Sequence, residues 1–349
     1  MLLHHGEPYV GAVKTGDEAG RLPKAEPVAD IVACVRIGGG RERHERHSRE
    51  ALAQSTQFGV LGPEVMAPLR DAVGFVHSDE GKPGGQALLA QPGQAREELL
   101  IEDGRYVIDF EDLEQKMKQA KIFILCSPHN PISRVWDRNE LDKMAELAAQ
   151  HDVFVISDEI HCDFSFTKKH TVFSKVARDH GVKHLLAFSA SKTFSLAGLN
   201  VASIVIEDPV LRDRYAERVR TDGVNTHSTF GFAAAEAGYT ECDDWYEKML
   251  DTVYQNYRLL KDYVVENMPL VHVFDLEGTY LAWLDFRALG VDHETLEKHM
   301  VDHCLYLDEG YIFGEGGRGF ERINLACPRR VIEAALGRLK ACYDDLSGE

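Results

Sequence analysis

Three short apolar segments, each followed at once by polar side chains, constrain the fold of this 349-residue chain more than any other feature. They span residues 121–126, 153–156 and 184–188. Continuous apolar runs of this length are typical of buried parallel strands, which helices cover on both faces. In open sheets of this kind, ligands bind beyond the carboxyl ends of the strands. The sequence therefore predicts a doubly wound, mostly parallel α/β sheet with polar groups gathered at one edge.

The polar residues that follow these runs include the side chains that an aldehyde cofactor needs. A partly desolvated lysine amine can form a Schiff base with an aldehyde, and Lys192 follows the third run closely. A carboxylate that ends a neighbouring strand can keep a pyridine nitrogen protonated, which makes the ring an electron sink. Asp158 suits this role better than Glu159, because successive side chains of a strand point to opposite faces. The pattern predicts a pyridoxal phosphate site.

Four further polar side chains from the same clusters belong to the predicted site. Asn130 and His161 can hydrogen-bond the hydroxyl group of the cofactor ring, and Ser189 and Ser191 can donate to its phosphate. Each of these residue types, taken alone, is more often an ordinary capping or surface residue. Their order at three successive strand ends favours a shared site.

Three motifs resemble those of a known family. They are Asp158–Asp163 (DEIHCD), Ser189–Phe194 (SASKTF) and Gly319–Pro328 (GFERINLACP), and the last is the most discriminating. With them the chain resembles the fold-type I pyridoxal phosphate enzymes of the aminotransferase class I/II superfamily, and most closely their C–S lyase branch, the MalY/PatB type of cystathionine β-lyase. The resemblance covers about residues 98–349. It implies that Arg322 binds the α-carboxylate of an amino acid substrate, for which a guanidinium fork is well suited.

The resemblance also implies an activity. A C–S β-lyase cleaves the Cβ–S bond of cystathionine or a related cysteine S-conjugate and releases a thiol, pyruvate and ammonia. In that reaction Lys192 is the expected base at the substrate Cα. An aminotransferase using the same groups is one alternative, and a catalytically impaired or regulatory family member is another. The family implies a homodimer.

The first 97 residues differ in composition from the rest. Up to Arg96 they hold 3 of the 31 aromatic residues but 14 of the 29 glycines, and 11 basic residues nearly balance 12 acidic ones. A shifted reading frame or a lack of order would explain a segment so poor in core material. Family members carry here a helix start that binds the cofactor phosphate and an aromatic ring that stacks on the cofactor, and neither motif is recognisable. We therefore expect weak cofactor binding.

Composition restricts the classes of partner and the cellular compartment that we expect for this protein. The net charge of −18 argues against nucleic acid as a partner. A membrane span is not expected, because the chain lacks an apolar run of about 18 residues, and the N-terminus lacks the apolar region of a signal peptide. Seven cysteines without a Cys-x-x-Cys pair suggest reduced thiols in the cytoplasm. The histidines lack the spacing of a metal site.

Beyond the first 97 residues, the patterns predict two domains. Residues 98–243 form a large cofactor-binding domain, and residues 244–349 contribute a long helix and a smaller α+β domain. The same patterns predict helices over 137–150, 209–220, 244–266, 293–303 and 329–344, and strands over 279–286 and 322–326. Ser133 stands where the family usually has glycine, so we expect a strained backbone there at a cost of about 1 kcal/mol.

Overall fold

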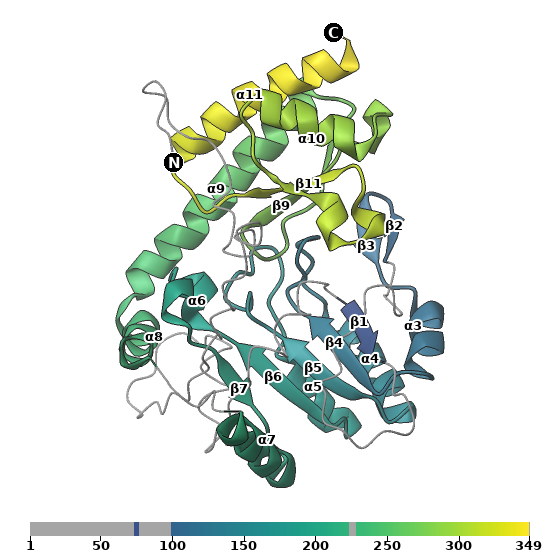
Figure 1. The fold of residues 1–349 in the computed structure, drawn as a ribbon, viewed down its shortest axis with the longest axis vertical. Helices are drawn as coiled ribbons and strands as arrows, with labels where there is room; N and C mark the ends of the chain where they lie inside the picture. Colours follow the sequence, from purple (N-terminus) through teal and green to yellow (C-terminus); the bar gives the residue numbers. More distant parts are fainter. Residues whose placement is uncertain (1–72, 77–98, 223–227, 349) are drawn as a thin grey trace.

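A computed structural model describes the backbone of residues 73–76 and all atoms of residues 99–222 and 228–348 (Figure 1). Residues 1–97 are the segment whose composition differs from the rest of the chain. Of these residues, the structure describes only the strand at 73–76. The proposals of a shifted reading frame and of missing order for that segment therefore stay predictions.

The larger sheet has five strands in the order β1-β4-β5-β6-β7. Their bounds are β1 (Val73–Val76), β4 (Ile122–Cys126), β5 (Phe154–Asp158), β6 (His184–Phe188) and β7 (Ser203–Val205). The central strands β4, β5 and β6 are parallel to one another, whereas β1 and β7 pair antiparallel at the two flanks. The expected parallel arrangement therefore holds at the centre of the sheet, and the sheet as a whole is mixed.

Helices cover both faces of this sheet, as a doubly wound fold requires (Figure 1). They are α3 (Phe110–Met117), α4 (Arg138–Gln150), α5 (Phe173–His180) and α7 (Pro209–Thr221). Alternate strand residues divide between the faces: Phe123 and Val155 pack with α3, α4 and α5, whereas Ile124 and Ile156 pack with α7. The continuous apolar runs of the central strands reflect this burial on two sides.

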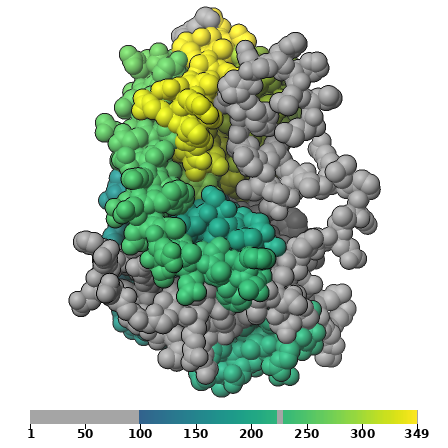
Figure 2. All heavy atoms as spheres, turned by 90° about the vertical axis from the view of Figure 1, so that its left-hand side faces the viewer, coloured from purple at the N-terminus to yellow at the C-terminus, as the bar shows by residue number. Residues whose placement is uncertain are grey.

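The second sheet is antiparallel and has the order β10-β11-β9-β8. Its strands are β8 (His272–Val273), β9 (Leu281–Asp285), β10 (Asp308–Glu309) and β11 (Phe320–Asn324). Helices α9 (Asp243–Asn267), α10 (His293–Asp302) and α11 (Arg329–Ser347) pack with it in a single buried cluster. Figure 2 shows α9 and α11 lying against each other along one face of the molecule.

Eight further elements complete the part of the chain that the structure describes. They are β2 (Leu100–Glu102), β3 (Arg105–Val107), α6 (Ala190–Thr193), α8 (Thr229–Glu241) and the 3₁₀ helices η3 (Ala197–Leu199), η4 (Arg287–Leu289), η5 (Gly310–Phe313) and η6 (Glu315–Gly317). The hairpin β2–β3 places Tyr106 against Phe274, with ring centroids 4.8 Å apart. An aromatic cluster therefore joins the core of the larger sheet to that of the smaller one.

The helices and strands expected downstream of residue 98 are confirmed to within a few residues. Asp137 and Glu140 form the reciprocal capping box that starts α4. The proposed domain boundary at residue 243 coincides with the start of α9, and we retain it as a proposal. In the described residues, no helix is both long enough and apolar enough to span a bilayer, and no cluster of three metal-ligating side chains occurs.

Candidate active site

The carboxyl ends of β4, β5 and β6 lie in register at one edge of the larger sheet. Asp158 is opposite Cys126 on one side and Ala187 on the other. The ladder continues past the strand ends, because the amide of Ser127 donates to the carbonyl oxygen of Asp158 at 2.9 Å and that of Glu159 donates to Ala187 at 2.7 Å. The three polar clusters predicted from the sequence therefore meet at one edge.

Asp158 presents a buried carboxylate at this edge. Its side chain is only 7% exposed, and the amide of Ile160 donates to its Oδ1 atom at 3.1 Å. Burial raises the pKa of Asp158 to about 6, and the positive charge of Lys192 acts in the opposite direction. A carboxylate held in this way is poised to accept a hydrogen bond from a cationic N–H group.

Glu159 points away from the edge, as the alternation of a strand predicts. Its carboxylate accepts hydrogen bonds from the amide of Phe173 at 2.8 Å and from the hydroxyl of Ser157 at 2.9 Å. His170 Nε2 lies 2.6 Å from its other oxygen. Glu159 is therefore a buried structural residue that ties β5 to the start of α5, and Asp158 alone of the pair lies at the edge.

Lys192 lies half-buried on the one-turn helix α6, immediately beyond β6. Ser189 caps this helix: its hydroxyl oxygen accepts from the amide of Ser191 at 3.0 Å, and its hydroxyl group donates to the carbonyl oxygen of Val201. The positive charge of Lys192 acts on the pKa of both Asp158 and His161, so its amine lies within electrostatic range of the two. The hydroxyl proton of Ser189 is engaged with the main chain, so its expected contact with a phosphate stays a prediction.

His161 is a neutral imidazole in this site. It is 3% exposed, and burial, with the nearby charges of Lys192 and Arg322, lowers its pKa to about 3. Its ring lies 5.5 Å from that of Tyr280, measured between centroids. In the described part of the chain, its Nδ1 atom is buried without a hydrogen-bond partner. An unsatisfied ring nitrogen here is available to a ligand.

Arg322 comes from β11 of the second sheet and reaches the same edge. Its Nη1 donates to Oδ1 of Asn130 at 2.7 Å, while Nε and Nη2 donate to Oδ2 of Asp308 at 3.0 and 2.6 Å. The guanidinium also stacks over the ring of Phe313 at 4.6 Å. The structure thus brings together Asn130, which follows β4, and Arg322, which the motif at residues 319–328 singled out.

Ser133 adopts the left-handed backbone conformation that its place in the sequence predicts, with φ of 59°. Main-chain contacts from the loop between β8 and β9 hold it there, because the amides of Glu277 and Gly278 both donate to its carbonyl oxygen, at 3.1 and 2.9 Å. Its side chain also contacts that of Thr279 at 3.3 Å. The strained turn is therefore fixed by the second layer of the molecule.

Two residues of the site did not receive a role from the sequence. Asp163 accepts hydrogen bonds from Thr193, the neighbour of Lys192, at 2.6 Å and from Tyr239 at 3.0 Å. Asp308 holds Arg322 across the β10–β11 pair. Asp163 lies in the motif DEIHCD, which could have drawn attention to it. No sequence motif could have predicted the role of Asp308, because its contact with Arg322 depends on the strand register.

Comparisons with known proteins agree with this geometry. The model of the family aminotransferase class I and II matches residues 100–339. Cystathionine β-lyase PatB of Bacillus subtilis (strain 168) is 34% identical over 296 residues, which cover 84% of this chain and 73% of PatB. Because residues 98–349 make up less than three quarters of the chain, this alignment extends upstream of residue 98.

Solved structures show the same likeness. Cystalysin of Treponema denticola, which contains a pyridoxal 5'-phosphate cofactor, has a TM-score of 0.68 and 41% identity, covering 71% of this chain and 64% of that chain. The PLP-bound C–S lyase of Staphylococcus hominis has a TM-score of 0.67 and 30% identity, covering 72% and 66%. This chain thus spans just under two thirds of the length of each solved structure. It belongs to the aminotransferase class I and II family, within the branch that includes cystathionine β-lyase PatB.

Proposed function

We propose that this protein is a pyridoxal phosphate-dependent carbon–sulfur β-lyase that cleaves cystathionine or a related cysteine S-conjugate to a thiol, pyruvate and ammonia. The observation that carries the proposal is the convergence of Asp158, Lys192 and Arg322 at the edge where β4, β5 and β6 end. The names of the relatives, cystathionine β-lyase and C–S lyase, support the type of reaction.

The residues at the edge suit this cofactor. A pyridinium nitrogen needs a buried carboxylate, and Asp158 supplies one. A ring hydroxyl needs polar partners, and His161 has a buried nitrogen without one in the described residues. An aldehyde needs an amine, and Lys192 lies within electrostatic range of Asp158 and His161. When bound, pyridoxal phosphate supplies an electron sink for the pair left at the substrate Cα.

Each residue then has a definite task. Asp158 would keep the ring nitrogen protonated, because its buried carboxylate can accept a hydrogen bond from that N–H group. Lys192 would hold the cofactor aldehyde, and its amine would also be the base that takes the proton from the substrate Cα. Burial lowers the pKa of His161 to about 3, so its imidazole is neutral at physiological pH and would orient the ring by a hydrogen bond.

Arg322 binds the substrate α-carboxylate in this proposal. Its guanidinium is held from one side by Asp308 and from the other by Asn130, so its orientation is fixed before substrate arrives. Asn130 would then contact two groups, because it would also hydrogen-bond the hydroxyl of the cofactor ring. The substrate amine would thereby be held near Asp158 and Lys192, where the proton transfer takes place.

Aminotransfer is the second candidate, because the matched family is named for it. Both reactions need Asp158, Lys192 and Arg322. They differ in the fate of the proton after it has been removed from the substrate Cα. Incubation of the full-length protein with cystathionine and pyridoxal phosphate, without a 2-oxo acid, separates them. Release of pyruvate and thiol supports the lyase. Product that forms only when a 2-oxo acid is added would establish the aminotransferase instead.

The proposal extends to assembly and location. A homodimer is supported by two large apolar side chains, Phe230 and Trp245, which are 80% and 47% exposed in the single chain. A cytoplasmic location is supported by the free state of the six described cysteines. Analytical ultracentrifugation tests the first point: a species of about 78 kDa, twice the 39.1 kDa of one chain, is expected, and a monomer at micromolar concentration would contradict it.

A further inference from the structure

Asn130 and His161 lie in two tight turns, which follow the strands β4 and β5. The first turn closes through the amide of Ser133, which donates to the carbonyl oxygen of His129 at 2.8 Å. The second turn closes through the amide of Phe164, which donates to the carbonyl oxygen of His161 at 2.9 Å. The two residues expected to hydrogen-bond the ring hydroxyl therefore belong to short turns that end at Ser133 and Phe164.

The loop between β8 and β9 holds the far ends of both turns. The amides of Glu277 and Gly278 donate to the carbonyl oxygen of Ser133 at 3.1 and 2.9 Å. The next amide, that of Thr279, donates to the carbonyl oxygen of Phe164 at 3.2 Å. Three consecutive residues of the small domain thus connect the turn that carries Asn130 with the turn that carries His161.

The loop and the two turns approach each other too closely for a side chain at Gly278. A Cβ atom there would lie 2.8 Å from the carbonyl oxygen of Phe164, 2.9 Å from the Cβ atom of Pro128 and 2.7 Å from Cγ2 of Val135. These atoms belong to the chain around both turns. Because packed backbone segments cannot move closer together, the position of the loop sets the separation of the turns.

The carboxylate of Glu277 anchors this loop, and the residue is only 5% exposed. Its Oε2 atom accepts from the amide of Val135 at 3.0 Å and from Nε of Arg134 at 3.0 Å. Its Oε1 atom accepts from Nη2 of Arg105 at 2.8 Å and lies 3.3 Å from Nζ of Lys168. Although burial acts to raise it, the pKa of Glu277 is held below its usual value by the amide of Val135 and by Arg134. The anion therefore fastens the loop directly to the chain that leaves the first turn.

We propose that Glu277 is a positioning residue of the candidate active site, whose carboxylate sets Asn130 and His161 at the correct separation to hydrogen-bond the hydroxyl of the cofactor ring. Glu277 acts through the two turns rather than by contact with the cofactor. The inference rests on the proposed function, in which Asn130 and His161 bind that hydroxyl. Hydrogen bonds weaken steeply when their geometry is lost, so a small shift of one turn should weaken binding of the hydroxyl selectively.

Calorimetric titration of the cofactor-free, full-length protein with pyridoxine 5'-phosphate and its 3-deoxy analogue measures this effect. Both ligands lack an aldehyde, so neither condenses with a lysine, and they differ only in the ring hydroxyl. The parent protein should bind pyridoxine 5'-phosphate at least about tenfold more tightly than the 3-deoxy analogue.

Glu277→Gln should reduce this ratio to about threefold or less, while the Kd of the 3-deoxy analogue stays within about twofold of the parent value. The glutamine keeps the size of the side chain, but its NH₂ group would face the donors of Arg105 and Lys168, so the loop must shift. If Glu277→Gln fails to fold, Glu277→Asp replaces it. The aspartate keeps the charge beside Arg134 but draws the carboxylate away from the amide of Val135, and the ratio should fall in the same way.

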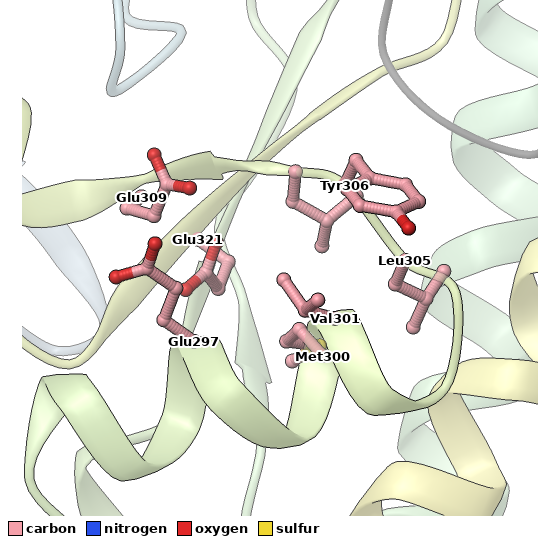
Figure 3. Close-up of a pocket in the computed structure, with 8 residues that line it drawn as sticks. Glu297, Met300, Val301, Leu305, Tyr306, Glu309 and Glu321 are labelled. Atoms are coloured by element: carbon pink, nitrogen blue, oxygen red, sulfur yellow. The ribbon is translucent and has the colours of Figure 1, made fainter. Parts of the chain in front are cut away.

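Glu297→Gln is the matched control. Glu297 is also a partly buried glutamate of the small domain, and its carboxylate accepts a hydrogen bond from Tyr311 at 3.0 Å. It lines a separate cavity between α10 and the strands β10 and β11 (Figure 3). This variant should keep the ratio of the parent protein, because it changes the small domain without touching the loop between β8 and β9.

A role in folding alone would change the Kd of both ligands by the same factor in the Glu277 variants and leave their ratio at the parent value, and that result would overturn the inference. Equal binding of the two ligands by the parent protein would also overturn it, while attachment of pyridoxal phosphate at Lys192 could still be found. Failure of the proposed function has a different signature. The parent protein would then bind neither ligand at millimolar concentration, and the inference would fall with it.

Discussion

Arg322 donates from Nη1 to the Oδ1 atom of Asn130 at 2.7 Å, although the two residues are 192 positions apart in the sequence. The first belongs to the small antiparallel sheet and the second follows the central strand β4 of the large sheet. This hydrogen bond connects the group expected to hold the substrate carboxylate with a group expected to hold the cofactor ring. The relative position of the two sheets therefore decides the geometry of the site.

Arg322→Lys should raise KM for amino acid substrates while the absorption spectrum of the bound cofactor stays unchanged. A lysine ammonium is a point charge that cannot replace the fork held between Asn130 and Asp308. The loss of one charge-assisted hydrogen bond corresponds to a change of about tenfold or more. Steady-state kinetics with the exposed Arg330→Lys as control measure the effect. A normal KM with an altered spectrum would argue against this role for Arg322.

Lys192→Ala should abolish covalent attachment of pyridoxal phosphate. Lys192 is the lysine whose charge acts on both Asp158 and His161. Borohydride reduction followed by peptide mass spectrometry detects the attachment, with the exposed Lys169→Ala as a control that should retain it. A reduced adduct that persists in Lys192→Ala would show that another amine holds the cofactor.

Asp158→Asn should leave the cofactor bound but reduce turnover by about two orders of magnitude or more. The neutral amide fills the same space but cannot keep the ring nitrogen charged, so the electron sink is lost. Cofactor content by absorbance and kcat from pyruvate release are measured on the same sample. The exposed Asp244→Asn provides the control, and near-normal kcat in Asp158→Asn would refute the assignment.

Asp158→Asn should also change how the stability of the cofactor-free protein depends on pH. Burial raises the pKa of Asp158 to about 6 in the folded state, against roughly 4 in the unfolded chain, so its ionisation disfavours folding. The parent protein should therefore lose up to about 3 kcal/mol relative to the variant as pH rises from 4 through 6. Below pH of about 4 the difference in stability between the two should no longer change with pH.

Urea unfolding at a series of pH values measures this difference. Asp244→Asn should parallel the parent protein throughout, because the position is exposed. A stability difference between parent and Asp158→Asn that is constant with pH would mean that the carboxyl group does not titrate in this range.

Much of the fold follows from local signals. The apolar runs predicted β4, β5 and β6 because these strands are buried on both faces, and the alternation of a strand separated Asp158 from Glu159. Asp137 and Glu140 predicted the start of α4, because both halves of a capping box lie within four residues of the sequence. Ser133 revealed a strained turn because serine stands where glycine was expected.

Contacts set by register and packing could not be predicted. Asp308 faces Arg322 only because β10 and β11 pair as they do, and β10 is two residues long, too short for a pattern. Asp163 reaches Thr193 through a tertiary contact across 30 positions. The contact that we expect between Ser189 and a phosphate stays a prediction; in the structure its hydroxyl oxygen accepts from Ser191 and its hydroxyl group donates to Val201, contacts that depend on the fold of the loop that follows α6.

Titration of the purified full-length protein with pyridoxal phosphate, with cystathionine as substrate and pyruvate release as the readout, tests the central claim most directly. The account predicts a visible absorption band and pyruvate formation without any added 2-oxo acid. Because the motifs for a phosphate-binding helix start and a stacking aromatic ring are not recognisable in the first 97 residues, half-saturation is expected above about 1 μM cofactor. A protein that neither gains the band nor releases pyruvate at saturating cofactor would contradict the claim that this chain is a pyridoxal phosphate-dependent carbon–sulfur lyase.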